Sequence, residues 1–108
     1  MDEIVYDAAP SPAAFASIKT MPSDVAAERS VLSAMLLSPE VLENALVELT
    51  EEDFFLDANR IIFSAMRTMF ERSNPVDPIS LADYLTSTGE LERAGGLPAL
   101  ARLGEDSF

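Results

Sequence analysis

The sequence predicts an all-α protein, a compact bundle of five or six short helices preceded by a flexible N-terminal arm. Three observations lead to this prediction. Apolar residues recur at intervals of three and four along most of the chain, which is helical spacing. Prolines and short side chains with an oxygen stand where such segments begin and end. No stretch alternates polar and apolar residues for long enough to predict a strand.

The arm is predicted at residues 1–21, which are acidic and interrupted by prolines. The small residues between the prolines have little apolar surface to bury, so we expect a poorly ordered segment. Part of the arm is compatible with one loose helical turn that places Phe15 and Ile18 on the same side. The helical domain is then expected at residues 22–108.

Two helices are predicted to follow and to meet at Ser38 and Pro39. Ser23 or Asp24 can cap the first, because a short side chain with an oxygen accepts hydrogen bonds from the free N–H groups of a first turn. Ser38 caps the second, where Pro39 takes the first helical position and Glu40 faces the positive end of the helix dipole. The residues expected to face inward are Val25, Leu32, Met35, Leu36, Leu42, Ala45, Leu46 and Leu49.

A short helical turn is predicted at residues 50–53, Thr-Glu-Glu-Asp. This spacing is similar to a capping box, with Asp53 as the residue whose side chain reaches back. The turn precedes Phe54 and Phe55, and two adjacent residues of a helical turn cannot both point inward. One ring is expected in the core and the other on the surface. Because exposed aromatic side chains are typical of protein interfaces, Phe55 is the candidate partner-binding residue.

The longest helix is predicted over residues 58–71, with Asp57 as its N-cap. A Ser-Asn-Pro sequence soon after residue 71 ends it. Apolar residues at intervals of three and four define the face that is expected to be buried. That face comprises Ile61 or Ile62, Ala65, Met66, Met69 and Phe70.

Two more helices complete the predicted bundle. The first ends at Thr88 and has two candidate caps, Asp77 and Ser80. Gly89 is expected to adopt the left-handed conformation that closes a helix. A single turn and a pair of glycines lead to a last short helix at residues 97–103. The inward residues of the first of these helices are expected to be Leu81, Tyr84 and Leu85.

The composition excludes several kinds of site. The chain has no cysteine and no histidine, which excludes a disulfide, a thiolate nucleophile, a zinc finger and a Ser-His-Asp triad. Neither glycine-rich phosphate-binding pattern is present, and the only lysine is Lys19, in the predicted arm. We therefore expect no enzymatic activity in this chain and no catalytic, cofactor-binding or metal-binding residues.

Carboxyl groups are densest at Glu51, Glu52, Asp53 and Asp57. A calcium or magnesium site, or a pair of hydrolytic carboxylates, needs acids that converge on one point, and the calcium-loop pattern is absent. Helix capping and solvated charge account for this cluster. A small carboxylate-dependent hydrolase remains an alternative that opposed acids in a cleft would support.

The net charge is −12, from 19 acidic and 7 basic residues. A surface this negative repels phosphate backbones and anionic membranes, so we expect the chain to bind neither DNA nor a membrane directly. It favours basic partner surfaces instead. No signal peptide or long apolar segment is evident, and we expect a cytoplasmic protein.

Four segments, in this order, resemble the N-terminal domain of the DnaB family of bacterial replicative DNA helicases. They are PSDVAAERSVLSAMLLSP at 22–39, EDFF at 52–55, NPVDPISLADYL at 74–85 and GELERAGGLPALARL at 89–103. Each segment alone consists mostly of regularly spaced apolar residues, but the four in this order are specific for the family. The chain departs from the usual pattern by carrying Ser33 for glycine, Phe55 for tyrosine and Asn59 for histidine.

The resemblance implies a ring-shaped, hexameric, ATP-driven helicase that unwinds duplex DNA at the replication fork. ATP, magnesium and DNA would be bound by a RecA-like C-terminal domain, which is expected beyond Leu103 after a helical hairpin and a linker helix. The N-terminal domains would form a collar built from dimers, on which primase docks. This chain would then be a fragment that contributes to assembly and docking and performs no catalysis. The alternative is a free-standing acidic regulator that mimics a nucleic acid and binds a basic partner.

Overall fold

The computed structural model describes residue 18 and residues 24–105. These residues form five α-helices and one 3₁₀ helix and include no strand, which confirms the predicted all-α bundle. The predicted flexible arm lies outside the described residues except for Ile18, which is helical and fully buried. The elements are α2 (Val25–Leu37), α3 (Pro39–Glu48), η1 (Glu51–Asp53), α4 (Asp57–Glu71), α5 (Pro78–Thr88) and α6 (Gly96–Glu105).

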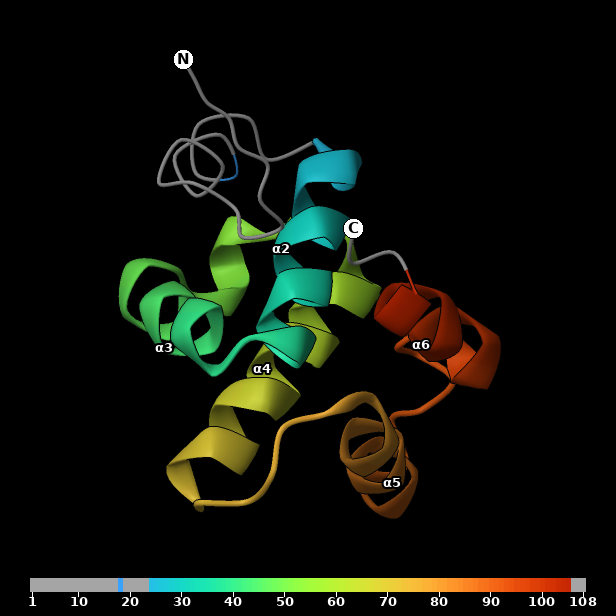
Figure 1. Cartoon of the computed structure of the whole chain (residues 1–108). Helices are drawn as coiled ribbons and strands as arrows, with labels where there is room; N and C mark the ends of the chain where they lie inside the picture. Colours follow the sequence, from blue (N-terminus) through green and yellow to red (C-terminus); the bar gives the residue numbers. More distant parts are fainter. Residues whose placement is uncertain (1–17, 19–23, 106–108) are drawn as a thin grey trace.

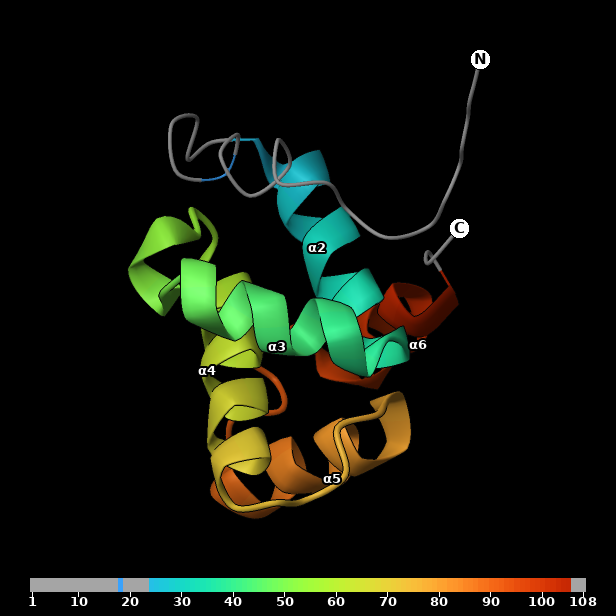
Figure 2. The ribbon, with the colours of Figure 1, turned by 60° about the vertical axis from the view of Figure 1, so that its left-hand side comes forward.

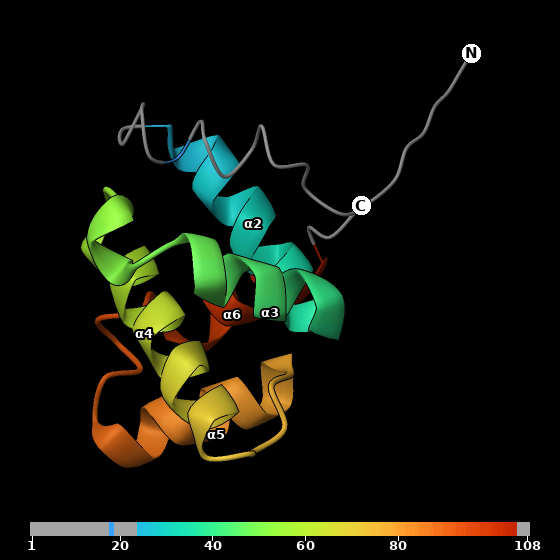
Figure 3. The same cartoon turned by 90° about the vertical axis from the view of Figure 1, so that its left-hand side faces the viewer.

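Helix α2 is the centre of the bundle, because α3, α4 and α6 all contact it. Figure 1 shows α3 on one side of α2 and α6 on the other. Helix α5 closes the far end, where it contacts α4 and α6. In Figure 2 α3 crosses in front with α5 below it, and Figure 3 shows α6 behind α3. No helix of the described part is long and apolar enough to cross a membrane.

Three side-chain caps begin helices as the sequence predicts. Asp24 caps α2, Ser38 caps α3 and Asp77 caps α5. In each case a side-chain oxygen accepts a hydrogen bond from the backbone N–H three residues further on, at 3.1, 3.3 and 2.8 Å respectively. The predicted capping box is also present, since the backbone N–H of Thr50 donates to Oδ2 of Asp53 at 2.9 Å.

The predicted cap of the longest helix is wrong. Helix α4 begins at Asp57 itself, its N-cap is Leu56, and no side chain caps it. Oδ2 of Asp57 instead accepts a hydrogen bond from Nη2 of Arg93 at 3.2 Å, and both side chains are more than half exposed. The sequence could not separate the two positions, because an acidic residue is favourable both at the cap and in the first turn.

This difference predicts unequal effects of two substitutions. Asp77→Ala is expected to lower the free energy of unfolding by about 1 kcal/mol, since it removes a side-chain cap. Asp57→Ala is expected to lower it by about 0.5 kcal/mol or less, because an exposed ion pair contributes little. Urea unfolding at low and high salt measures both. Salt should remove the Asp57 effect and leave the Asp77 effect; a salt-independent loss of about 1 kcal/mol at Asp57 would restore the cap assignment.

One hydrophobic core lies between the helices. Val25, Leu46 and Tyr84 are half-buried, and both candidates at positions 61 and 62 are buried. Phe63, which the sequence pattern did not select, is fully buried. The residues predicted to face inward that are buried as expected are Leu32, Met35, Leu36, Leu42, Ala45, Leu49, Ala65, Met66, Met69, Leu81 and Leu85.

Phe70 is a correction to the predicted face of α4. It was expected in the core, but it is 40% exposed, because it lies in the last turn of α4 beside two surface hollows. Helix α4 is wrapped by η1, α2 and α5, so its buried face is wider than a single stripe and lies closer to the middle of the helix.

Two glycines set the end of the bundle. Gly89 has a φ of 77° and closes α5 in the left-handed conformation, as predicted. Gly95 has a φ of 109°, and a Cβ atom there would lie 2.7 Å from Cβ of Ala99. Only glycine fits this turn. Helix α6 then starts at Gly96, one residue earlier than predicted, and extends two residues beyond Leu103.

Candidate protein-docking site

The segment that follows η1 buries one aromatic ring and exposes the next. Phe54 is fully buried, with its ring centroid 4.9 Å from that of Phe63. Phe55 is 53% exposed, and Leu56 beside it is also exposed. The predicted division between an inward and an outward phenylalanine is confirmed. Phe55 and Leu56 together form an apolar pair on the surface, which we name the Phe55 turn.

A buried acidic residue of α2 holds the Phe55 turn in place. Glu28 has no exposed surface. Its Oε2 accepts a hydrogen bond from the backbone N–H of Phe55 at 2.5 Å, and its Oε1 accepts one from Nδ2 of Asn59 at 2.8 Å. A carboxylate accepts hydrogen bonds and donates none, so both of its oxygens suit these donors. Glu28 therefore ties α2 to the start of α4 and fixes the backbone from which the Phe55 ring projects.

Glu28 was not among the predicted functional residues, although its position on an apolar helix face is a signal that the sequence contains. Glu28 lies four residues before Leu32 and seven before Met35, so it shares the apolar face of α2. An acidic residue is almost never fully buried unless it is paired. An acid on an apolar helix face therefore predicts a buried polar partner, although its position alone does not identify that partner.

Two arginines of α4 further secure the surrounding backbone. Nε of Arg60 donates to the carbonyl oxygen of Phe54 at 2.6 Å. Nη2 of Arg67 donates to the carbonyl oxygens of Leu46 and Leu49, at 3.2 and 2.9 Å. These bonds satisfy carbonyl groups at the end of α3 and after η1. The exposed apolar pair is thus presented on a segment that is held from two sides.

The chain segment that leads into the Phe55 turn is acidic, while the side chains of Arg60 and Arg93 bring positive charge to the turn itself. Residues 39–59 contain no lysine or arginine. Asp53 is engaged in the capping box and Asp57 in the ion pair with Arg93, so these two acids serve local structure. Within the described residues, no group of three or more acidic side chains comes together in a way that could hold a metal ion. The acids of this segment are Glu40, Glu43, Glu48, Glu51, Glu52, Asp53 and Asp57.

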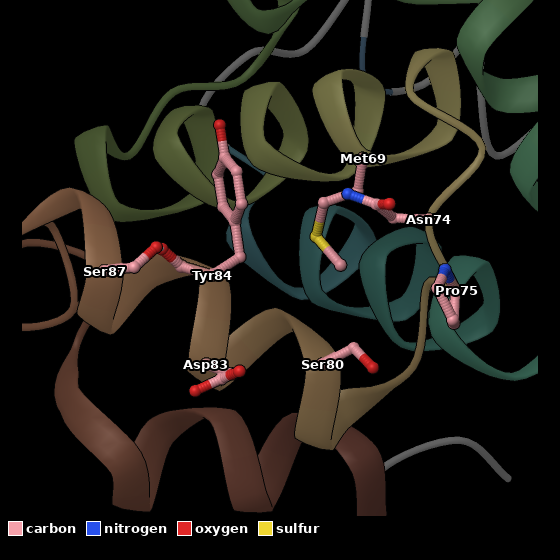
Figure 4. A pocket seen from close by; sticks show the side chains of 7 residues that line it. All are labelled: Met69, Asn74, Pro75, Ser80, Asp83, Tyr84 and Ser87. Carbon is pink, nitrogen blue, oxygen red and sulfur yellow. The ribbon is translucent and has the colours of Figure 1, made fainter.

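Hollows of about 290, 320 and 360 Å³ lie on the surface of the described residues. The first lies between the end of α4 and α5 and is lined by both polar and apolar side chains (Figure 4). In that view the carboxyl group of Asp83 points away from the ring of Tyr84. The polar side chains that line this hollow therefore do not converge on one point as those of a ligand site do. The other two hollows share Phe70 as a lining residue.

A helical bundle with a net charge of −12 that presents an exposed aromatic side chain on a hydrogen-bonded turn has the features of a small interaction domain. Residues 20–107 match the model of the family described as DnaB-like helicase N terminal domain. The chain belongs to this family, and the resemblance found in the sequence is confirmed. The comparisons give no support to the alternative of a free-standing acidic regulator.

Curated relatives show how much of a longer protein the chain covers. It is 35% identical over 85 residues to the replicative DNA helicase DnaB of Leifsonia xyli, and 38% identical over 82 residues to that of Mycobacterium leprae. These alignments cover 79% and 76% of this chain but only 19% and 14% of the relatives. The chain therefore spans less than a fifth of the length of these helicases.

A solved structure supports the same assignment. The crystal structure of the N-terminal domain of DnaB helicase from Mycobacterium tuberculosis superposes with a TM-score of 0.73 and 37% sequence identity. The match covers 78% of this chain and 58% of that one. At this level of identity the likeness extends beyond a shared helical arrangement.

Proposed function

We propose that this chain is the N-terminal collar domain of a replicative DNA helicase and that it serves hexamer assembly and primase docking. The observation that carries the proposal is the family match over residues 20–107. The complete protein would unwind duplex DNA at the replication fork in the cytoplasm, using ATP. ATP, magnesium and DNA would be bound by a RecA-like domain outside this chain. The collar domain itself would perform no catalysis.

The charge of the chain supports this division of roles. A net charge of −12 opposes contact with phosphate backbones, so DNA binding is better placed in another domain. The same charge favours docking of basic protein surfaces. In the complete protein, the collar domains would pair into dimers, and these dimers would build the hexamer.

Titration of the chain with the primase of the same organism tests the docking role. Isothermal titration calorimetry is expected to show saturable binding, because the apolar pair of the Phe55 turn is available for burial. A labelled single-stranded DNA at physiological salt is expected to show no binding by fluorescence anisotropy. Tight binding of DNA without binding of primase would contradict the proposal.

The Phe55 side chain is expected to be the anchor of that interface. Phe55→Ala should weaken primase binding about tenfold or more, since truncation of a central aromatic at an interface commonly costs about 2 kcal/mol. Leu97→Ala on α6 is the matched control, because Leu97 is 57% exposed and Phe55 is 53% exposed. The control is expected to change the affinity less than about twofold. Equal losses in the two variants would rule out a specific role for Phe55.

A further inference from the structure

A second apolar surface lies at the other end of α4, away from the Phe55 turn. It is a hollow of about 360 Å³ between α3 and α4, which we name the α3–α4 groove. The Phe55 turn precedes the first residue of α4, whereas the groove is lined by residues of its last two turns. Thirteen residues of helix separate the two ends by about 20 Å. The residues that line the groove are Glu43, Leu46, Val47, Arg67, Phe70 and Glu71.

Apolar side chains of the groove are left uncovered by the described fold. Val47 is 81% exposed, and Phe70 is the exposed phenylalanine at the end of α4. Leu46 lies between them and the core, since it packs partly against the buried cluster. An apolar hollow between two helices is the kind of surface into which an amphipathic helix lays its apolar face.

The polar groups of the groove indicate the charge of what it binds. Glu43 and Glu71 are both exposed, one on each of the two helices. Arg67 is the basic residue of the lining, but its Nη2 donates to the carbonyl oxygens of Leu46 and Leu49. These carbonyl acceptors hold the guanidinium against α3 and leave its charge in place, so the two glutamates and the arginine give the lining an excess of negative charge. The exposed carboxylates of Glu43 and Glu71 can therefore pair with positive charge on a bound partner. Lysine and arginine side chains on the flanks of a bound helix would supply it.

A second copy of the chain is a poor occupant of the groove. The α3 helix of each copy contains three glutamates and no basic residue. Bringing two such surfaces together opposes like charges, which disfavours association. The charge therefore favours a different, basic partner.

We propose that the α3–α4 groove docks a basic amphipathic helix of a partner protein, with apolar residues on Leu46, Val47 and Phe70 and basic residues on Glu43 and Glu71. This proposal goes beyond the proposed function, because it concerns a different surface from the Phe55 turn. It holds whether or not primase binds at Phe55, and its test uses no primase.

The test is a fluorescence-anisotropy titration of the 108-residue chain with labelled designed peptides. The probe is a short helical peptide with leucines on one face and lysines on its flanks. Two comparison peptides replace lysine by glutamate or scramble the same residues so that no apolar face forms. Saturable binding of the amphipathic lysine peptide alone is expected. Equal binding of the scrambled peptide would overturn the proposal, because it would indicate only a general attraction to an acidic surface.

Matched variants locate the bound peptide. Val47→Gln is expected to weaken binding about tenfold, since it removes an exposed apolar side chain that lines the groove. Ile79→Gln is the control, because Ile79 is 83% exposed on α5, outside the groove, and should change binding less than about twofold. Both replaced side chains are exposed, so neither substitution should affect folding. Equal effects of the two variants would overturn the proposal.

Two charge-neutralising double variants complete the test. Glu43→Gln with Glu71→Gln should weaken binding and flatten its salt dependence more than Asp83→Asn with Glu92→Gln, although both remove two negative charges. The same outcome for both pairs would contradict charge recognition in the groove.

Sedimentation of the wild-type chain and of Val47→Gln tests whether a second copy of the chain occupies the groove. Self-association that Val47→Gln abolishes would assign the groove to a second copy and overturn the proposal of a basic partner.

Discussion

Phe63→Ala is expected to lower the free energy of unfolding by about 3–5 kcal/mol. Phe63 is fully buried in α4, with its ring centroid 4.9 Å from that of Phe54. The guanidinium carbon of Arg67 lies 5.3 Å from the Phe63 centroid. Truncation would lose the transfer energy of the ring, the aromatic pair and the cation–π contact, and would leave a cavity between the helices.

Phe70→Ala is the matched control, since it makes the same substitution in the same helix at a residue that is 40% exposed. It is expected to lower the free energy of unfolding by about 1 kcal/mol, because an exposed side chain leaves no cavity. Urea denaturation followed by circular dichroism measures both variants. A larger loss at Phe70 would return it to the buried face that the sequence pattern predicted and would contradict the packing of α4.

Sequence spacing could not show which side of α4 is most deeply buried, because its apolar residues follow one another too closely. Ile61, Ile62 and Phe63 are consecutive and all three are buried. A helix that contacts neighbours on several sides buries more than one stripe, and periodicity then no longer distinguishes the centre of the buried face from its edge. The choice between Phe63 and Phe70 depends on where the neighbouring helices lie, which is tertiary information.

Helix boundaries were predictable for the opposite reason, because they depend on a few neighbouring residues. Ser38 and Pro39 end one helix and begin the next through contacts within four residues. Gly89 closes α5 through its own backbone conformation. The assignment of Asp57 failed even though it is local, since the cap and the first turn both favour an acid.

In the candidate site too, features set by neighbouring residues were predictable and those set by tertiary contacts were not. Phe54 has an extended backbone directly after η1, and successive side chains of an extended segment point to opposite sides, so one of Phe54 and Phe55 faces inward and the other outward. Glu28 bonds to groups 27 and 31 residues further along the chain. No local pattern contains such a contact, so the residue that holds the Phe55 turn is identified only when the fold brings α2 against the start of α4.

Glu28→Gln is expected to lower the free energy of unfolding by about 1.5–3 kcal/mol, although it changes neither the size nor the shape of the side chain. Both oxygens of Glu28 accept hydrogen bonds, from the backbone N–H of Phe55 and from Nδ2 of Asn59. The introduced glutamine has one oxygen and one NH₂ group, so one buried donor would face another donor. Glu40→Gln, at an exposed residue of α3, is the control and is expected to change stability by less than about 0.5 kcal/mol.

A second substitution separates the loss of this particular bond from a general loss of packing. Asn59→Asp should partly rescue Glu28→Gln, because the new carboxylate accepts from the glutamine NH₂ group while the glutamine oxygen still accepts from the N–H of Phe55. Asn59→Asp alone should destabilise, since it places two carboxylates against each other. Urea denaturation of the four chains gives the coupling energy. Hydrogen exchange at the Phe55 amide should accelerate in Glu28→Gln and slow again in the double variant; additive losses without rescue would show that Glu28 does not hold the Phe55 turn through these bonds.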